Sequence, residues 1–149
     1  GDITLEDNII SIQIALEALS YIILVEKEGL LDDEQFDQNN ASKNIKLVLN
    51  ACNIPHGSDE LELFDDWIRG KFDDGVDLVI YFRNKIVHPV RKDNRANLTV
   101  EDMWNIIQIG TKYIELIVLS FIGYKGEYSN RLKERWFGEV EVVPWNKLD

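Results

Sequence analysis

Two long stretches of helical periodicity dominate this chain. In residues 4–28, isoleucine and leucine recur every three or four residues, and a second such run covers residues 100–121. Thr4 and Thr99 each precede an aspartate by three positions, which is the pattern of a capping box at a helix start. The first run is apolar around most of its circumference, so it must pack between other helices or against a second subunit. These features predict an all-α bundle.

Shorter helices are expected between the two long ones. They are predicted at residues 42–52, 58–69 and 74–88, with a polar, acidic loop at 32–40 and a turn at 53–57. Beyond Gly123 the chain is rich in glycine and aromatic residues, and residues 139–143 alternate as in a strand. The predicted architecture is therefore an all-α helical bundle with two long and several short helices, plus a short extended C-terminal tail.

Length and composition indicate one soluble domain. A chain of 149 residues with 45% hydrophobic residues can bury a core of its own, so residues 1–149 are expected to form a single domain with 123–149 packing on the bundle. The chain starts with Gly1 and enters a helix at once, which suggests a domain excised from the C-terminal part of a longer protein. Cys52 is the only cysteine, so the sequence predicts no disulfide and a reducing, bacterial cytoplasmic location.

Charge and hydropathy limit the partners. The most apolar run, 114–124, is interrupted by Glu115 and is shorter than the roughly 20 residues of a membrane span, so no membrane association is expected. A net charge of −11 disfavours general binding of nucleic acid. Residues 81–97, however, carry five basic residues and one acidic residue, a local balance of +4 that leaves −15 for the rest of the chain. This basic segment is the best candidate for contact with a polyanion.

The basic segment contains a polar motif at the end of an apolar helix, Arg83–His88, which is followed by Pro89. Asn84 and His88 are four residues apart and share a face, whereas Arg83 lies about 140° around and about 7.5 Å along the axis from His88. A helix C-terminus stabilises the imidazolium, and Pro89 pushes the residue before it out of α geometry. His88 is therefore a candidate proton carrier. Two structural alternatives stay open: His88 as a C-cap, and Arg83 paired with one of the 27 carboxylates.

The order Arg, polar residue, three further residues, His resembles the signature of the HEPN superfamily, whose small helical domains include many metal-independent ribonucleases. The chain is most similar to bacterial HEPN domains that end larger toxin-like or antiphage defence proteins. In those domains an Arg-Asn-x-x-x-His-Pro helix is followed by a long helix and a tail that contains Gly-Tyr. Here the tail opens with Gly123-Tyr124 and ends in Val143-Pro144-Trp145. The resemblance extends over most of residues 1–145. It implies an RNA substrate, a role in toxicity or antiviral defence, and a possible sensor domain upstream.

Cleavage of RNA without a metal requires deprotonation of the 2′-hydroxyl, stabilisation of charge at phosphorus and protonation of the leaving 5′-oxygen. One histidine cannot comfortably do all of this, but a symmetric dimer that packs two motif helices together supplies two histidines and two arginines. The resemblance implies such a composite site in a homodimer. By that analogy Arg83 binds the scissile phosphate, Asn84 orients the phosphate or His88, and His88 acts as base or acid. Neither a cofactor nor a metal site is expected.

Further RNA contacts are predicted around the motif and in the tail. The candidate substrate-binding residues are Lys85, Arg91, Lys92, Arg95, Tyr124, Tyr128 and Arg131. The basic residues would follow the RNA backbone, and the tail residues would clamp a nucleotide if the tail folds back over the cleft. The alternatives are a solvated turn that balances acidic patches and a tail that is merely fixed to the bundle.

Three functions from different classes follow. The first is a HEPN-type endoribonuclease domain. The second is a catalytically inactive HEPN domain that serves dimerisation or binds a nucleotide or a partner protein, which the overall acidity favours. The third is an unrelated helical interaction module in which the motif is coincidental.

Overall fold

The computed structural model describes residues 4–88, 98–133 and 140–148. The helices are α1 (Leu5–Tyr21), which continues as a π-helical segment (Ile22–Lys27), then α2 (Asp33–Gln38), α3 (Ala41–Ala51), a 3₁₀ turn (Ser58–Leu61), α4 (Asp66–Lys71), α5 (Gly75–Val87) and α6 (Val100–Phe121). The strands β1 (Glu127–Tyr128) and β2 (Glu141–Val142) precede a last 3₁₀ turn (Pro144–Leu148). The predicted all-α class is confirmed, because one small two-stranded sheet stands beside a bundle of helices.

Local capping signals set the starts of the long helices. The Thr4 hydroxyl accepts a hydrogen bond from the Asp7 backbone N–H at 3.1 Å, and the Asp7 carboxylate accepts one from the Thr4 N–H. Thr99 and Asp102 make the same reciprocal pair at 3.0 and 3.1 Å. Both predicted capping boxes are confirmed. At the far end of the first helix, Gly29 has φ +60°, a left-handed conformation that favours glycine.

Two details of the predicted helix order are wrong. The predicted loop at 32–40 contains the helix α2, because Asp32 and Gln35 form a capping box and Phe36 packs edge-on against Tyr21 with ring centroids 5.2 Å apart. The predicted single helix over 58–69 is instead a 3₁₀ turn and α4, which are separated by residues 62–65. In both cases the helix boundaries follow tertiary contacts and caps rather than periodicity.

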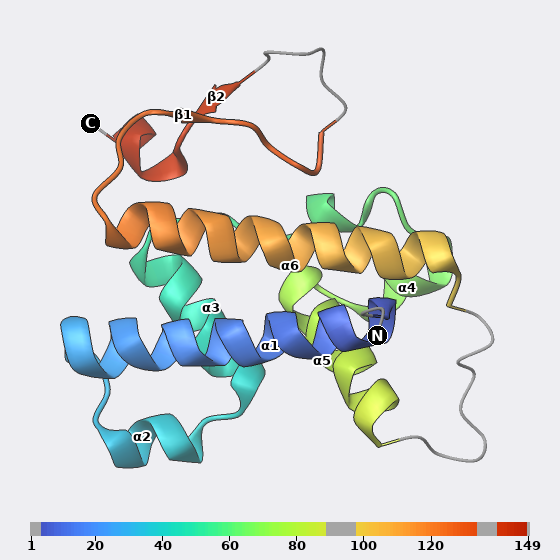
Figure 1. The fold of residues 1–149 in the computed structure, drawn as a ribbon, viewed down its shortest axis with the longest axis horizontal. Coiled ribbons are helices and arrows are strands. Elements are labelled where there is room, and N and C mark those ends of the chain that lie inside the picture. The colour runs from blue at the N-terminus through green and yellow to red at the C-terminus, as the bar shows by residue number, and fades with distance from the viewer. Residues whose placement is uncertain (1–3, 89–97, 134–139, 149) are drawn as a thin grey trace.

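The two long helices lie side by side, with α3 and α5 behind them (Figure 1). Gly110 of α6 marks their closest approach, since a Cβ atom there would overlap the Ile12 side chain of α1. The fully buried core includes Ile9, Leu16, Leu24, Ile45, Leu49, Leu61, Ile68, Leu78, Ile106, Ile109 and Tyr113. These residues come from α1 and its π-helical continuation, α3, α4, α5, α6 and the 3₁₀ turn Ser58–Leu61, so one core joins all of these elements.

Within the described residues, Leu5–Lys27 is a helix long and apolar enough to cross a membrane by length and composition alone. Core helices of soluble proteins pass the same test. The buried residues Ile9, Ile12 and Leu16 belong to the hydrophobic core, and α1 packs against α3, α5 and α6. Packing in the bundle therefore accounts for the hydropathy of this helix, while the expected lack of membrane association stays a prediction.

The tail forms a short hairpin over α6, on the side away from α1 (Figure 1). Its strands are antiparallel, with Glu127 opposite Val142 and Tyr128 opposite Glu141. Arg131 Nε donates a hydrogen bond of 2.6 Å to Glu115 Oε1 of α6, which ties the tail to the bundle.

We expect the tail hairpin to survive well into acid, because Glu141 joins its parts. The carboxylate accepts hydrogen bonds from Tyr128 Oη (2.7 Å), Asn130 Nδ2 (2.9 Å) and Lys133 Nζ (2.9 Å). Burial raises the pKa of Glu141, but these hydrogen bonds outweigh it and lower the pKa to about 2, below the ordinary 4.5. A folded-state pKa below the unfolded value stabilises the fold above pH 4.5, and this stability is lost as the pH falls through about 2.

An NMR titration of the Glu141 carboxyl carbon measures this directly. The expected midpoint lies near 2, and the Trp145 indole, whose Nε1 donates to the Tyr124 carbonyl at 2.6 Å, should change little above pH 3 or so. A midpoint near the ordinary 4.5 would contradict the hydrogen-bonded arrangement.

Candidate functional site

Helix α5 positions the motif residues. It starts at the N-cap Asp74, whose Oδ1 accepts a hydrogen bond from the Asp77 N–H at 3.0 Å, and it ends at Val87. His88 has left helical geometry with φ −121° and ψ 70°, while its N–H still donates to the Asn84 carbonyl at 2.8 Å. The predicted N-cap and helix end are confirmed; Pro89 lies outside the described residues.

Arg83 is half-buried and is not neutralised by a described carboxylate. Its Nη1 donates a hydrogen bond of 3.2 Å to Asn84 Oδ1, and its Nε is enclosed with no hydrogen-bond partner. No ion pair joins Arg83 to an acid in residues 4–88, 98–133 or 140–148. The structural alternative for Arg83, a buried ion pair, is therefore absent from the described part of the chain.

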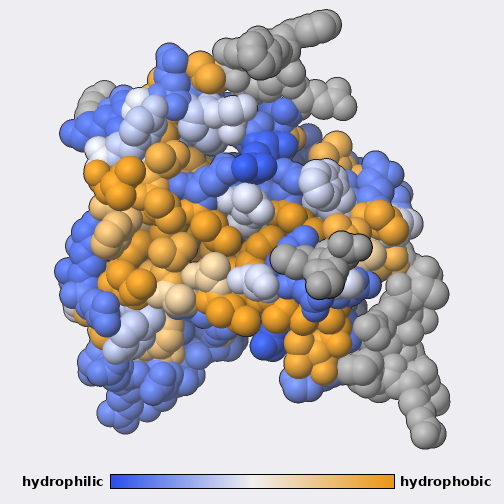
Figure 2. All heavy atoms as spheres, in the orientation of Figure 1, coloured by the Kyte–Doolittle hydropathy of each residue, from blue (hydrophilic) through white to orange (hydrophobic). Residues whose placement is uncertain are grey.

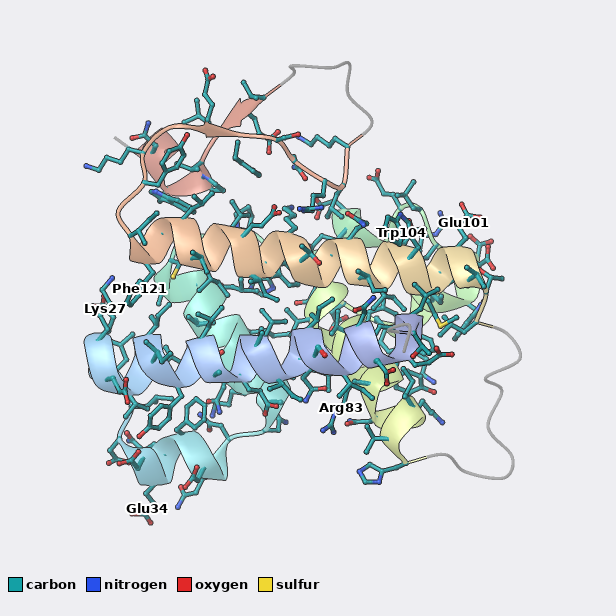
Figure 3. The ribbon with its side chains drawn as sticks, viewed as in Figure 1. Lys27, Glu34, Arg83, Glu101, Trp104 and Phe121 are labelled. Atoms are coloured by element: carbon teal, nitrogen blue, oxygen red, sulfur yellow. The ribbon has the colours of Figure 1, made fainter. Side chains whose placement is uncertain are left out.

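A cavity of about 470 Å³ lies beside Arg83. It is lined by Gln13, Glu17, Asn40, Ala41, Ser42, Ile80, Arg83 and Asn84, which come from α1, the start of α3, and α5. Gln13 is buried, and its Nε2 donates to Glu17 at 3.2 Å while its Oε1 has no partner. Both residues line the cavity, and each has a buried polar atom without a hydrogen-bond partner, Nε of Arg83 and Oε1 of Gln13. Figure 3 shows the Arg83 side chain extending from α5 beneath α1.

His88 is exposed at the end of α5 and does not line this cavity. Its imidazole is therefore open to solvent, one helical turn beyond Asn84. The structure brings Arg83 and Asn84 together but leaves a gap between them and the His88 ring within one chain.

Lys85 occupies a different side of the helix. It lines a small cavity with Phe82 and Leu98, and its Nζ lies 5.2 Å from the centroid of the Tyr81 ring. The hydrogen bond from Lys71 to Tyr81 Oη, 2.9 Å long, lowers the pKa of Tyr81 below 10, and Lys85 adds to this effect. Lys85 is thus held among aromatic groups rather than beside Arg83. The candidates Arg91, Lys92 and Arg95 lie outside the described residues.

The tail candidates do not reach the motif within one chain. Tyr124 Oη donates to the Glu127 carbonyl at 2.7 Å, Tyr128 binds Glu141, and Arg131 binds Glu115. Figure 1 shows the tail along α6, whereas the C-terminal end of α5 emerges beyond α1 on the opposite side of the molecule. These contacts match the alternative that the sequence left open, in which the three side chains fix the tail. Their role in binding substrate stays a prediction.

Sequence reasoning missed the contribution of α1 to the cavity. Gln13 and Glu17 are four residues apart on an otherwise apolar helix, and this polar pair was the available signal. A second polar cluster was also missed, at the start of α5. His56 Nδ1 lies 2.7 Å from Asp74 Oδ2, and Lys46 Nζ lies 2.9 Å from Asp77 Oδ2. In the described part of the chain, no group of three or more His, Cys, Asp or Glu side chains could hold a metal ion.

Comparison with known proteins identifies the family. The family model described as the YopA C-terminal domain matches residues 1–142, so the chain belongs to this family. The chain is also similar to the SPbeta prophage-derived uncharacterized protein YopA of Bacillus subtilis (strain 168), with 34% identity over 146 residues. That match covers 97% of this chain and 32% of the relative, so the chain spans about a third of the relative's length. No solved structure matches the chain.

Proposed function

We propose that this chain is a HEPN-type, metal-independent endoribonuclease domain whose composite site forms across a homodimer. The observation that carries the proposal is the Arg83 guanidinium, which has no carboxylate partner among the described residues and is hydrogen-bonded to Asn84, on the same helix that ends at the exposed His88. A guanidinium without a carboxylate partner keeps its donors for a phosphate. An exposed imidazole at a helix end can exchange protons with substrate.

The chemistry divides among these groups. His88 removes a proton from the 2′-hydroxyl or gives one to the leaving 5′-oxygen, and two copies of His88 divide these tasks. Arg83 donates hydrogen bonds to the non-bridging oxygens, where negative charge grows in the transition state. Asn84 fixes the direction of the guanidinium through its side-chain oxygen. None of these roles needs a metal.

The apolar surface supports a dimer. Figure 2 shows apolar side chains gathered over α1 and α6. The exposed large apolar residues of these two helices include Ile14, Val118 and Phe121. Two chains that each carry a net charge of −11 repel one another. An apolar face carries few carboxylates, so it is the surface at which two copies can associate.

The family match supports the biological setting. The similar protein from Bacillus subtilis is described as prophage-derived. We propose that the domain acts in the bacterial cytoplasm as a toxin or an antiphage effector. The chain spans about a third of that relative, so an upstream region would act as sensor or restraint.

The test is cleavage of an end-labelled transfer or messenger RNA in excess EDTA, followed by identification of the product ends. We expect 2′,3′-cyclic phosphate and 5′-hydroxyl ends, because the 2′-hydroxyl is the nucleophile. Cleavage that requires added Mg²⁺, or products with 5′-phosphate ends, would contradict the mechanism. The longer chain should be assayed in parallel, because an upstream region that activates the domain would leave the domain alone inert.

A catalytically inactive HEPN domain that serves dimerisation or binds a nucleotide or partner is the second candidate. The specific observation in its favour is Glu17, a carboxylate that lines the same cavity as Arg83 and disfavours an RNA phosphate there. A dimer measured by light scattering, together with no RNA cleavage by either the domain or the longer chain, would favour this candidate.

A further inference from the structure

A basic and aromatic cluster lies on the side of α5 that does not line the Arg83 cavity. Lys71, the last residue of α4, donates a hydrogen bond of 2.9 Å to Tyr81 Oη of α5. Lys71 Nζ also lies 4.2 Å from the centroid of the Tyr81 ring, and Lys85 Nζ lies 5.2 Å from the same centroid. Two ammonium groups from different helices thus meet at one phenol ring.

Helical geometry places this cluster on the same side of α5 as His88. Lys85 and His88 follow Tyr81 by four and seven residues, so the three residues lie within about 60° of one another around the helix. Arg83 lies about 160° from Tyr81. The His88 N–H still donates to the Asn84 carbonyl, so His88 keeps its place at the end of the helix, about 10 Å along the axis from Tyr81. The proposed proton carrier therefore shares a side of α5 with the cluster.

Aromatic packing fixes the position of the cluster. The Tyr81 ring meets the Phe72 and Phe82 rings edge-on, with centroids 5.0 and 5.1 Å apart. Both phenylalanines are buried, so the Tyr81 ring has a defined position before a ligand arrives. Donors that are already in place lose less conformational entropy when a ligand binds.

The polar groups of the cluster are open to a ligand. Lys71 is exposed, and Tyr81 and Lys85 are half-buried. Within residues 4–88, 98–133 and 140–148, no carboxylate forms an ion pair with Lys71. Tyr81 Oη accepts the hydrogen bond from Lys71, which leaves the proton of the phenol for another acceptor. The same hydrogen bond lowers the pKa of Tyr81, so the phenol is a stronger donor.

The charges around the cluster favour an anion. The net charge of −11 comes from residues outside 81–97, because that segment has a local balance of +4. Lys71 adds a positive charge to this segment from a separate helix, which the sequence did not reveal. Glu6 lines the same small cavity as Lys85 and opposes an anion there. Ammonium groups bind phosphate as point charges, and an acidic protein offers a polyanion few other places.

We propose that Lys71, Tyr81 and Lys85 form a second RNA subsite, which binds a backbone phosphate that flanks the phosphate cleaved beside His88. The two ammonium groups supply charge, and Tyr81 Oη donates a hydrogen bond to a phosphate oxygen. The RNA strand then runs along the His88 side of α5. The choice of RNA as ligand rests on the proposed ribonuclease function. Because the contacts are to phosphate, binding at this subsite is independent of base sequence.

The probe is a fluorescein-labelled dodecamer of 2′-deoxyuridine, which lacks the nucleophilic hydroxyl and so binds without being cleaved. Fluorescence anisotropy in EDTA at low salt measures its affinity, and amide chemical shifts of the ¹⁵N-labelled chain locate its site. We expect saturable binding, with shifts concentrated in residues 69–73 and 81–88. The measurement does not depend on cleavage, so failure of the ribonuclease proposal and failure of the subsite can be told apart.

Lys71→Met removes the ammonium group but keeps most of the apolar stem. It should weaken binding about two- to fivefold, and the slope of log affinity against log salt should fall by about 0.7 for the lost phosphate contact. The matched control is Lys125→Met, which removes an exposed lysine of the tail and should keep the affinity and slope of the parent.

Two further variants test the other groups. Tyr81→Phe keeps the ring and removes the donor, so it should also weaken binding about two- to fivefold, but with an unchanged salt slope because no charge is lost. Glu6→Gln removes the opposing carboxylate and should strengthen binding. If Lys71→Met does not fold, these two variants carry the test.

Three results would overturn the proposal. One is the lack of saturable binding up to about 1 mM of the chain, which is weaker than ordinary non-specific binding of nucleic acid. Another is equal affinity and equal salt slope for the parent and a folded Lys71→Met, or equal affinity for the parent and Tyr81→Phe. The third is tighter binding of poly-L-glutamate than of the oligonucleotide, which would assign the cluster to an acidic protein.

Discussion

Replacing His88 by alanine should lower the rate of RNA cleavage in EDTA by about 100-fold or more, because a positioned proton carrier contributes about 10² to 10⁴ to such reactions. The side chain of His88 is exposed, and the residue is hydrogen-bonded to Asn84 through its backbone N–H, so the melting temperature should hardly change. Single-turnover cleavage of labelled RNA measures the effect. The matched control is Lys43→Ala, which removes an exposed charge on α3 and should cleave at the parent rate.

A composite site makes a stronger prediction for mixed dimers. Arg83→Ala should also lose about 10² to 10³ in rate, because it removes a donor to the transition-state charge. In a cleft shared by both chains, a heterodimer of the two variants keeps one Arg83 and one His88, whereas each variant homodimer lacks both copies of one of these residues. Mixing the inactive proteins under conditions of subunit exchange should then restore part of the parent rate.

No recovery on mixing, in spite of proven exchange, would place Arg83 and His88 of one site in the same chain. Full activity of His88→Ala would exclude the proposed proton carrier altogether. The mixing experiment is informative because, within one chain, His88 does not line the cavity that Arg83 lines.

Local sequence signals predicted the helix starts and the motif helix. The boxes at Thr4 and Thr99 and the N-cap at Asp74 depend on side chains within three residues of the groups they cap, so the sequence alone contains the whole interaction. The exit of His88 from helical geometry was likewise encoded by Pro89 next to it.

Features that depend on contacts between distant residues were missed. Gln13 lines the Arg83 cavity because α1 packs on α5, and Arg131 meets Glu115 because the tail folds over α6. The break between the 3₁₀ turn and α4 places Leu61 and Phe64 in the core, which a continuous helix over 58–69 would arrange differently. Periodicity describes one segment at a time and contains no information on these neighbours.

Asp74→Ala should lower the free energy of unfolding by about 3–5 kcal/mol, because it breaks a buried network of charges at the start of α5. Asp74 is buried; its Oδ1 caps the helix, and its Oδ2 lies 2.7 Å from His56 Nδ1 and 3.5 Å from Lys46 Nζ. Burial lowers the pKa of Lys46, but the hydrogen bond to Asp77 and the charge of Asp74 outweigh it and raise the pKa above 10.5. Without Asp74, His56 Nδ1 loses its partner, although Nε2 keeps Asn50 Oδ1 at 3.0 Å, and Lys46 keeps the Asp77 carboxylate.

Urea denaturation at neutral pH measures this loss, and Asp32→Ala is the matched control. Like Asp74, Asp32 accepts a hydrogen bond from the backbone N–H three residues on, but no ion pair joins it to a described residue, so its removal should cost about 1 kcal/mol. Asp74→Asn should fall between the two, because the amide oxygen still caps the helix while the charge is lost. Equal costs for Asp74→Ala and Asp32→Ala would mean that the cap alone matters. A larger cost for Asp74 would show that the charge network at one end of α5 holds the helix that presents Arg83 and His88 at the other.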